Sequence, residues 1–174
     1  MKTLQNIFNR LEEIGVPVTE PCTPEDLKGS KKLMKNVLAL VNKFGVSLEK
    51  KDNYLWLQNG KVQFRVRKRQ ENVLYVGCRI LGKDLYSPDN GVAEMFVWIR
   101  EDELVPIELN QPYHLLTSCT KWSHILEKPV SPDELSQCNL EAQHLLTDLA
   151  NTWATRLEED EWLNESKLIE KQDS

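Results

Sequence analysis

The chain has 174 residues, a net charge of −5, and 40% hydrophobic and 28% charged residues, which is an ordinary composition for a globular protein. A chain of this length can fold without a disulfide or a metal. No apolar run approaches the roughly 18 residues of a membrane-spanning helix, and the acids and amides near the start do not fit a signal peptide. We therefore expect a single domain over residues 1–174 that lies in the cytoplasm and makes no membrane contact.

Two amphipathic helices are predicted in the first quarter of the chain. Apolar residues recur at helical spacing over residues 2–14 and again over residues 33–44. Ser30 is placed to cap the start of the second helix, and Gly45 is placed to end it.

The apolar pattern then changes to the alternation typical of strands. Asn59-Gly60 is a strong hairpin signal between two such runs. Strands joined by short turns are expected to be antiparallel neighbours, and Pro106 would put the last of them at a sheet edge. The predicted strands lie within residues 53–69, which hold two, and within residues 71–81, 91–100 and 103–109.

The last quarter predicts one long helix. Residues 111–130 fit neither period cleanly, but Ser131 and Pro132 then provide a cap and a first-turn proline. Apolar residues at steps of three and four indicate a helix over residues 133–163, and residues 164–174 read as a frayed polar tail.

These elements predict an α+β fold. It has two N-terminal helices, an antiparallel meander of four to five strands, and a long C-terminal helix packed on the apolar face of the sheet. Small acidic secretion-chaperone-like proteins have a similar layout, and that resemblance concerns the order of elements alone.

Side chains alternate across a strand, so the three clearest strands can be sorted into two faces. One set is entirely apolar and is expected to be covered by helices. The other set, the mixed face, carries five arginines, one glutamate and three aromatic rings. The residues of the mixed face proposed as binding residues are Arg65, Arg67, Arg69, Tyr75, Arg79, Phe96, Trp98 and Arg100.

Charge is distributed unevenly along the chain. Residues 61–80 hold six bases and one acid, whereas residues 131–174 hold 11 acids and 3 bases. The acidic segment EEDEW at residues 158–162 is either a solvated helix face or a shield for the basic mixed face, within the chain or in a dimer.

The mixed face has several interpretations. It can be a solvated sheet surface on which arginine stems cover apolar area. It can contact another protein, since Trp, Tyr and Arg dominate interface energetics, or bind nucleic acid through phosphate contacts and base stacking, or hold a small anion. The acidic net charge argues against a dedicated nucleic-acid binder.

Cysteine and histidine positions indicate no specific chemistry. Cys22, Cys78, Cys119 and Cys138 have no CxxC spacing, so we expect four reduced thiols. His114, Cys119 and His124 follow at five-residue steps, which do not converge on a helix or a strand, so no metal is expected.

Enzymatic motifs are weak. Acid-x-Lys elements of nucleases occur about as often as chance would place them, and the phosphate-binding glycine loops are absent from the sequence. The pairs Cys119–His124 and Cys138–His144 leave nucleophilic catalysis open, because sequence distance does not fix spatial distance.

The sequence therefore favours a non-catalytic binding or adaptor protein, accessory or chaperone-like, without a cofactor. Its expected partner is another protein, with nucleic acid second, and homo-oligomerisation is left open. An enzyme of unidentified class is the third candidate.

Overall fold

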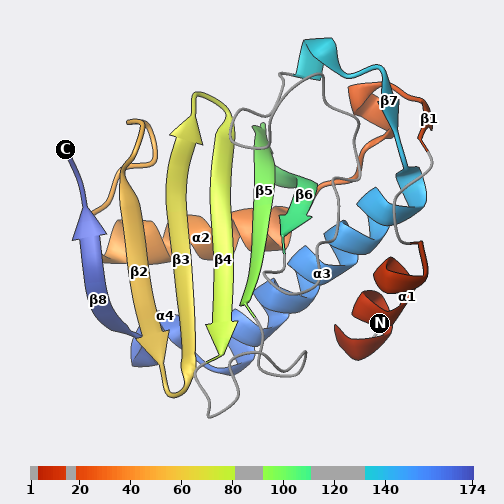
Figure 1. Ribbon diagram of the computed structural model, residues 1–174. Coiled ribbons are helices and arrows are strands. Elements are labelled where there is room, and N and C mark those ends of the chain that lie inside the picture. The colour runs from red at the N-terminus through yellow and green to blue at the C-terminus, as the bar shows by residue number, and fades with distance from the viewer. Residues whose placement is uncertain (1–3, 15–18, 81–91, 111–131) are drawn as a thin grey trace.

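The fold is seen in a computed structural model that describes residues 4–14, 19–80, 92–110 and 132–174. Three helices lie against one face of a six-stranded antiparallel sheet, and the N-terminal helix packs beside the longest of them (Figure 1). The predicted α+β class, with N-terminal helices, an antiparallel meander and a long C-terminal helix on the sheet, is confirmed. No helix in these ranges is both long and apolar enough to cross a membrane.

The sheet is a meander to which one C-terminal strand is added. Its strand order is β6-β5-β4-β3-β2-β8, so β6 and β8 are the two edges, and the prediction that Pro106 lies on an edge strand is confirmed. The strands are β2 (Tyr54–Asn59), β3 (Val62–Gln70), β4 (Val73–Ile80), β5 (Val92–Arg100), β6 (Glu103–Asn110) and β8 (Lys167–Gln172).

The helices lie where the periodicity predicted them in the N-terminal part. The helices are α1 (Leu4–Ile14), α2 (Lys31–Lys43), α3 (Leu140–Glu159) and α4 (Trp162–Glu165). The Ser30 hydroxyl accepts a 3.0 Å hydrogen bond from the backbone N–H of Leu33, which confirms the predicted cap of α2. Gly45 follows α2 with φ +69°, a conformation that favours glycine, so this helix ends where expected.

The apolar sheet face and the helices form the main core. Val66, Val76 and Met95 are fully buried at successive places across the sheet, and Leu149 of α3 is equally buried in the same cluster. The helices therefore occupy one side of the sheet and leave the mixed face on the other side (Figure 1).

The start of the long helix was predicted wrongly. Residues 132–134 form a single 3-10 turn, and α3 begins at Leu140 with Asn139 as its cap. Between them, Gln137–Cys138 (β7) pairs with Glu20–Pro21 (β1) as a two-residue ladder. A proline followed by acids starts one helical turn here, and the tertiary pairing of β7 then prevents the turn from continuing.

The end of that helix also differs from the prediction. α3 stops at Glu159, and Glu161 has φ +52°, which separates α3 from the short helix α4. Residues 164–174, predicted as a frayed tail, include β8, which pairs antiparallel with β2. Its sequence KLIEKQ is too polar to read as a buried strand, because an edge strand needs only backbone hydrogen bonds on one side.

The prediction of four free thiols is wrong for two of them. Cys22 and Cys138 form a disulfide with Cα atoms 6.0 Å apart, although 116 residues separate them in sequence. The β1–β7 ladder brings them together, and no local sequence signal predicts such a pairing. Cys78 is free.

Several predictions lie outside the described residues. These are residues 111–130 with His114, Cys119 and His124, and the cap role of Ser131. The last fails on other grounds, since α3 is capped at Asn139.

Replacing Asn139 with alanine should lower the free energy of unfolding by about 1 kcal/mol, because its side chain accepts a 2.9 Å hydrogen bond from the backbone N–H of Ala142. Asn139→Asp keeps an acceptor there and should retain most of the stability. Urea titration measures both, and an unchanged midpoint in Asn139→Ala would contradict the assignment of this cap.

Peptide mapping without reduction should find Cys22 and Cys138 in one linked fragment. Cys78 should react with an alkylating reagent only after denaturation, because burial raises the pKa of its thiol to about 11 and leaves little thiolate at neutral pH. Alkylation of Cys22 and Cys138 in unreduced protein would contradict the disulfide.

Candidate binding surface on the open part of the mixed face

The mixed face is divided into two parts. Over β5 and β6 it is covered by the β1–β7 ladder and the adjoining 3-10 turns, which lie beside that end of the sheet (Figure 1). A second, smaller core fills the space between them. Its buried members are Cys22, Leu27, Val73, Phe96, Trp98, Val105, Ile107, Leu135 and Cys138.

This second core contains two of the predicted binding residues. Phe96 is 7% exposed and Trp98 is 2% exposed, so neither ring presents a face to a partner. The mixed face predicted from alternation is therefore not one continuous exposed surface. Alternation reports which side of a sheet a residue faces and does not report what else packs on that side.

Arg100 is also occupied within the fold. Its Nε donates to Glu103 at 2.8 Å, Nη1 donates to the carbonyl of Pro24 at 2.8 Å, and Nη2 donates to the carbonyl of Leu27 at 2.9 Å. This arginine thus fastens residues 24–27 to the end of β5.

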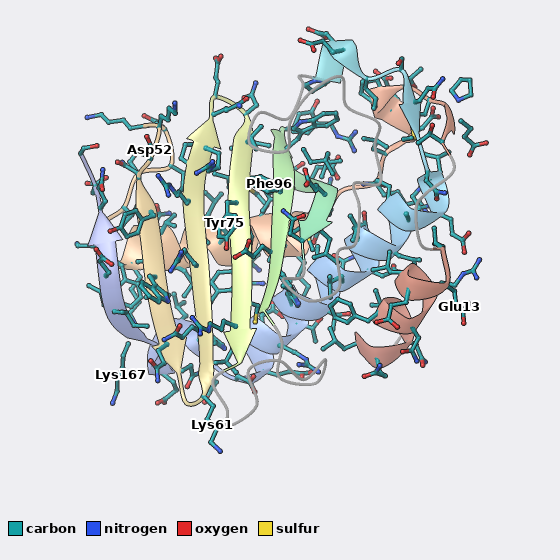
Figure 2. All side chains as sticks on the ribbon, in the orientation of Figure 1. Glu13, Asp52, Lys61, Tyr75, Phe96 and Lys167 are labelled. Atoms are coloured by element: carbon teal, nitrogen blue, oxygen red, sulfur yellow. A yellow bond between two sulfur atoms is a disulfide. The ribbon has the colours of Figure 1, made fainter. Side chains whose placement is uncertain are left out.

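The remaining part of the mixed face, over β8, β2, β3 and β4, is called the open sheet face. Its side chains stand in rungs across neighbouring strands, and Figure 2 shows Tyr75 between the β3 side and Phe96 on β5. The open sheet face comprises Tyr54, Trp56, Gln58, Gln63, Arg65, Arg67, Tyr75, Arg79, Lys167 and Glu170.

One rung places a cation on an aromatic ring. Arg65 lies opposite Trp56, and its guanidinium carbon is 4.2 Å from the centroid of the indole. This distance is within the range of a cation–π interaction. One face of the indole ring is thereby covered by the guanidinium.

The same rung continues through a glycine on which a tyrosine rests. A Cβ on Gly77 would lie 2.8 Å from the phenolic oxygen of Tyr75, so this ring passes over the glycine. The ring of Tyr75 also meets Phe96 edge to face at 5.9 Å. Burial and a hydrogen bond to Glu94 raise the pKa of Tyr75.

A second rung pairs charges at its outer end. Arg67 Nη2 contacts Asp52 Oδ1 at 3.0 Å, with both side chains more than a third exposed, so this ion pair adds little stability. On the next strand the hydroxyl of Tyr54 donates to Glu170 Oε1 at 2.6 Å, which raises the pKa of Tyr54.

The other two predicted arginines have no ion-pair partner in the part of the chain that the structure describes. Arg79 is exposed at the far end of β4, opposite Gln63. Arg69 is the extra residue where the β3–β4 register shifts between Lys68 and Gln70, so alternation no longer fixes its side.

Three residues that lie on the open sheet face were not identified from the sequence. Tyr54 and Trp56 follow from the hairpin itself, because a two-residue turn sets them opposite Arg67 and Arg65. Glu170 had no usable signal, because the strand that carries it was not predicted.

A polar hollow of about 620 Å³ lies beside α3, lined partly by Lys28, Arg100, Glu103, His144 and Asp148. Two neighbouring side chains of α3, Thr147 and Gln143, bond to the Lys28 backbone, with Thr147 Oγ1 donating at 2.9 Å and Gln143 both donating and accepting. The side chains of Gln143 and Thr147 thus hold the backbone of Lys28 in place beside this hollow.

The hypothesis that Cys138 acts as a nucleophile with His144 as its base is not supported, because Cys138 is in a disulfide.

The described ranges contain no group of three or more metal-binding side chains close enough to hold an ion. The acidic run at residues 158–161 lies at the end of α3, where Glu158 contacts Lys32 at 3.2 Å on α2 and its pKa is lowered by hydrogen bonds from Asn36 and Lys32. Glu158 therefore pairs on the helical side of the sheet.

No protein-family model, curated protein sequence or solved structure matches this chain.

Gly77→Ala should lower the free energy of unfolding by about 1–3 kcal/mol, because the added methyl group displaces the Tyr75 ring from its contacts. In a Tyr75→Ala background the same glycine substitution should cost clearly less. Urea titration of the four proteins gives the coupling between the two positions, and equal costs in both backgrounds would show that the ring is not held by the glycine.

Proposed function

We propose that this protein is a non-catalytic binding protein whose open sheet face holds an acidic segment of a protein partner. The observation that carries the proposal is the state of its charges. Three carboxylates on or beside this face are already engaged: Asp52 with Arg67, Glu94 with Tyr75, and Glu170 with Tyr54. Among the residues that the structure describes, the charged side chains of this face that make neither an ion pair nor a hydrogen bond are basic.

Arg65 and Arg79 are the residues expected to bind the partner. Arg65 is held in a fixed position by Trp56, so less side-chain entropy is lost when it binds a carboxylate. A guanidinium offers a planar fork of donors that matches a carboxylate in a bidentate contact.

The aromatic rings favour a protein partner over nucleic acid. Base stacking needs an open ring face. The indole of Trp56 is covered by Arg65, Tyr75 lies on Gly77 and Phe96, and Trp98 is buried. The accessory nucleic-acid role is therefore the second candidate, and it would depend on phosphate contacts and on the ring of Tyr54, whose hydroxyl is hydrogen-bonded to Glu170.

A cytoplasmic location is a separate proposal from the sequence. The Cys22–Cys138 disulfide argues against it, because stable disulfides are uncommon in reducing compartments. Thiol mapping on protein isolated directly from its source organism distinguishes a reducing compartment, where Cys22 and Cys138 would be free thiols, from an oxidising one, where they would be linked.

Binding is tested with fluorescent Glu–Tyr copolymer as an acidic polypeptide and with single-stranded RNA and DNA oligonucleotides, each at two salt concentrations. Wild-type protein should bind the copolymer more tightly at low salt. Arg65→Gln combined with Arg79→Gln should weaken that binding about a hundredfold or more, since each of the two lost charge-assisted contacts is worth roughly 1.5–3 kcal/mol, while a thermal melt changes little.

The matched control is Lys35→Gln combined with Arg156→Gln, which removes the same charge from exposed positions on the helical side. It should leave copolymer binding nearly unchanged. Equal losses in both double variants, or no binding of the copolymer, would contradict the proposal. Binding of the oligonucleotides alone would favour the nucleic-acid role.

A further inference from the structure

The two edges of the sheet are not equivalent. The outer edge of β6 is engaged, because Ser30 exchanges two backbone hydrogen bonds with Leu104, at 2.8 and 3.1 Å. Pro106 also lacks an N–H on that strand. β8 is the opposite edge, all six of its residues are exposed, and it has no strand on its outer side among the described residues.

Exposed apolar side chains gather at this open edge. The structure describes four large hydrophobic residues that are exposed, each to between 38% and 43%. Three of them, Leu163, Leu168 and Ile169, lie within α4 and β8, and the fourth, Leu38, lies on α2. Scattered single hydrophobics on a surface are ordinary, whereas a group beside unpaired backbone indicates a contact site.

A register shift puts opposite charges of β8 on one face. Lys167 pairs with Gln58 and Glu170 pairs with Trp56, so both point toward the open sheet face although they are three positions apart, an odd spacing that would put them on opposite faces of a regular strand. Ile169 is the extra residue that makes this possible.

We infer that β8 pairs antiparallel with β8 of a second copy of this chain, which joins the two sheets into one. When the two-fold axis of the two paired strands passes between Leu168 and Ile169, Leu168 of each copy lies opposite Ile169 of the other copy. Each Lys167 then lies opposite Glu170 of the second copy, so apolar contacts at the centre are flanked by two attractive charge pairs.

Neighbouring registers are less favourable. Centring the pair on Glu170 would oppose that carboxylate with itself, and centring it on Leu168 or on Ile169 would set neither Lys167 nor Glu170 opposite a group of the other charge. Opposed like charges destabilise paired strands. Only the register centred between Leu168 and Ile169 sets Lys167 opposite Glu170, so these two charges favour that register of self-association. Because the contact is small, it should dissociate on dilution.

Dimerisation through β8 is independent of the binding proposed for the open sheet face. Arg65→Gln combined with Arg79→Gln should leave the dimer unchanged, so either proposal can fail without the other. Lysines and bulges on an edge strand can instead prevent strands from pairing. If β8 has that protective role, the protein should be a monomer.

Sedimentation velocity over a dilution series tests the inference. Wild-type protein should be a dimer that dissociates on dilution. Lys167→Glu and Glu170→Lys should each weaken the dimer about tenfold, because each converts two attractive pairs into repulsive ones. An equimolar mixture of the two single variants should regain the wild-type affinity, because the exchanged charges oppose each other only in the mixed dimer.

Two controls separate the edge from general effects. Tyr54→Phe removes the hydrogen bond to Glu170 without changing charge and should leave the dimer intact. Ile169→Asp should abolish the dimer, and Leu38→Asp, at a position of similar exposure on α2, should not. A wild-type protein that is monomeric at every concentration overturns the inference. A dimer that survives Ile169→Asp, or a mixture of the charge variants that fails to recover, overturns it as well.

Discussion

The contact between the apolar sheet face and α3 determines what the rest of the molecule can do. Strand alternation means that burying Val66, Val76 and Met95 against the helices forces their neighbours in sequence onto the opposite side. Arg65, Arg67 and Tyr75 are therefore displayed together as a consequence of core packing. A one-residue slip in register would bury arginines and expose the core, so the surface is as firmly specified as the fold itself.

The second core sets the limit of that surface. The disulfide between Cys22 and Cys138 lies within this core, and the β1–β7 ladder holds the cover over β5 and β6. Arg100 adds three hydrogen bonds from the end of β5 to the same cover and to Glu103. The aromatic residues beneath this cover pack in the second core, whereas the aromatic residues on β2 to β4 lie beside arginines of the open sheet face. The same sheet face therefore contributes to a buried core where β1 and β7 cover it, and it forms an exposed surface where they do not.

Sequence reasoning succeeded where a signal was local. The Ser30 cap, the Gly45 helix end and the hairpin at Gly60 depend on neighbouring residues and on a left-handed backbone that favours glycine. It failed where the cause was distant in the chain. The pairing of β7 with β1, the disulfide and the burial of Trp98 each involve residues that lie far apart in sequence, and β8 is stabilised by β2 more than 100 residues earlier. A polar edge strand carries almost no pattern of its own.

The unpredicted strand changes the balance of charge on the open sheet face. Without β8, the hydroxyl of Tyr54 would have no carboxylate beside it, and Trp56 would stand at the rim of the sheet. With β8 in place, Glu170 is occupied by Tyr54, and the basic residues on β3 and β4 are not neutralised by it. The same strand gives the sheet its open edge. Pairing two β8 strands would bring two open sheet faces into one surface with a two-fold axis between them, and a partner with repeated acidic segments would then bind with the added affinity of two linked sites.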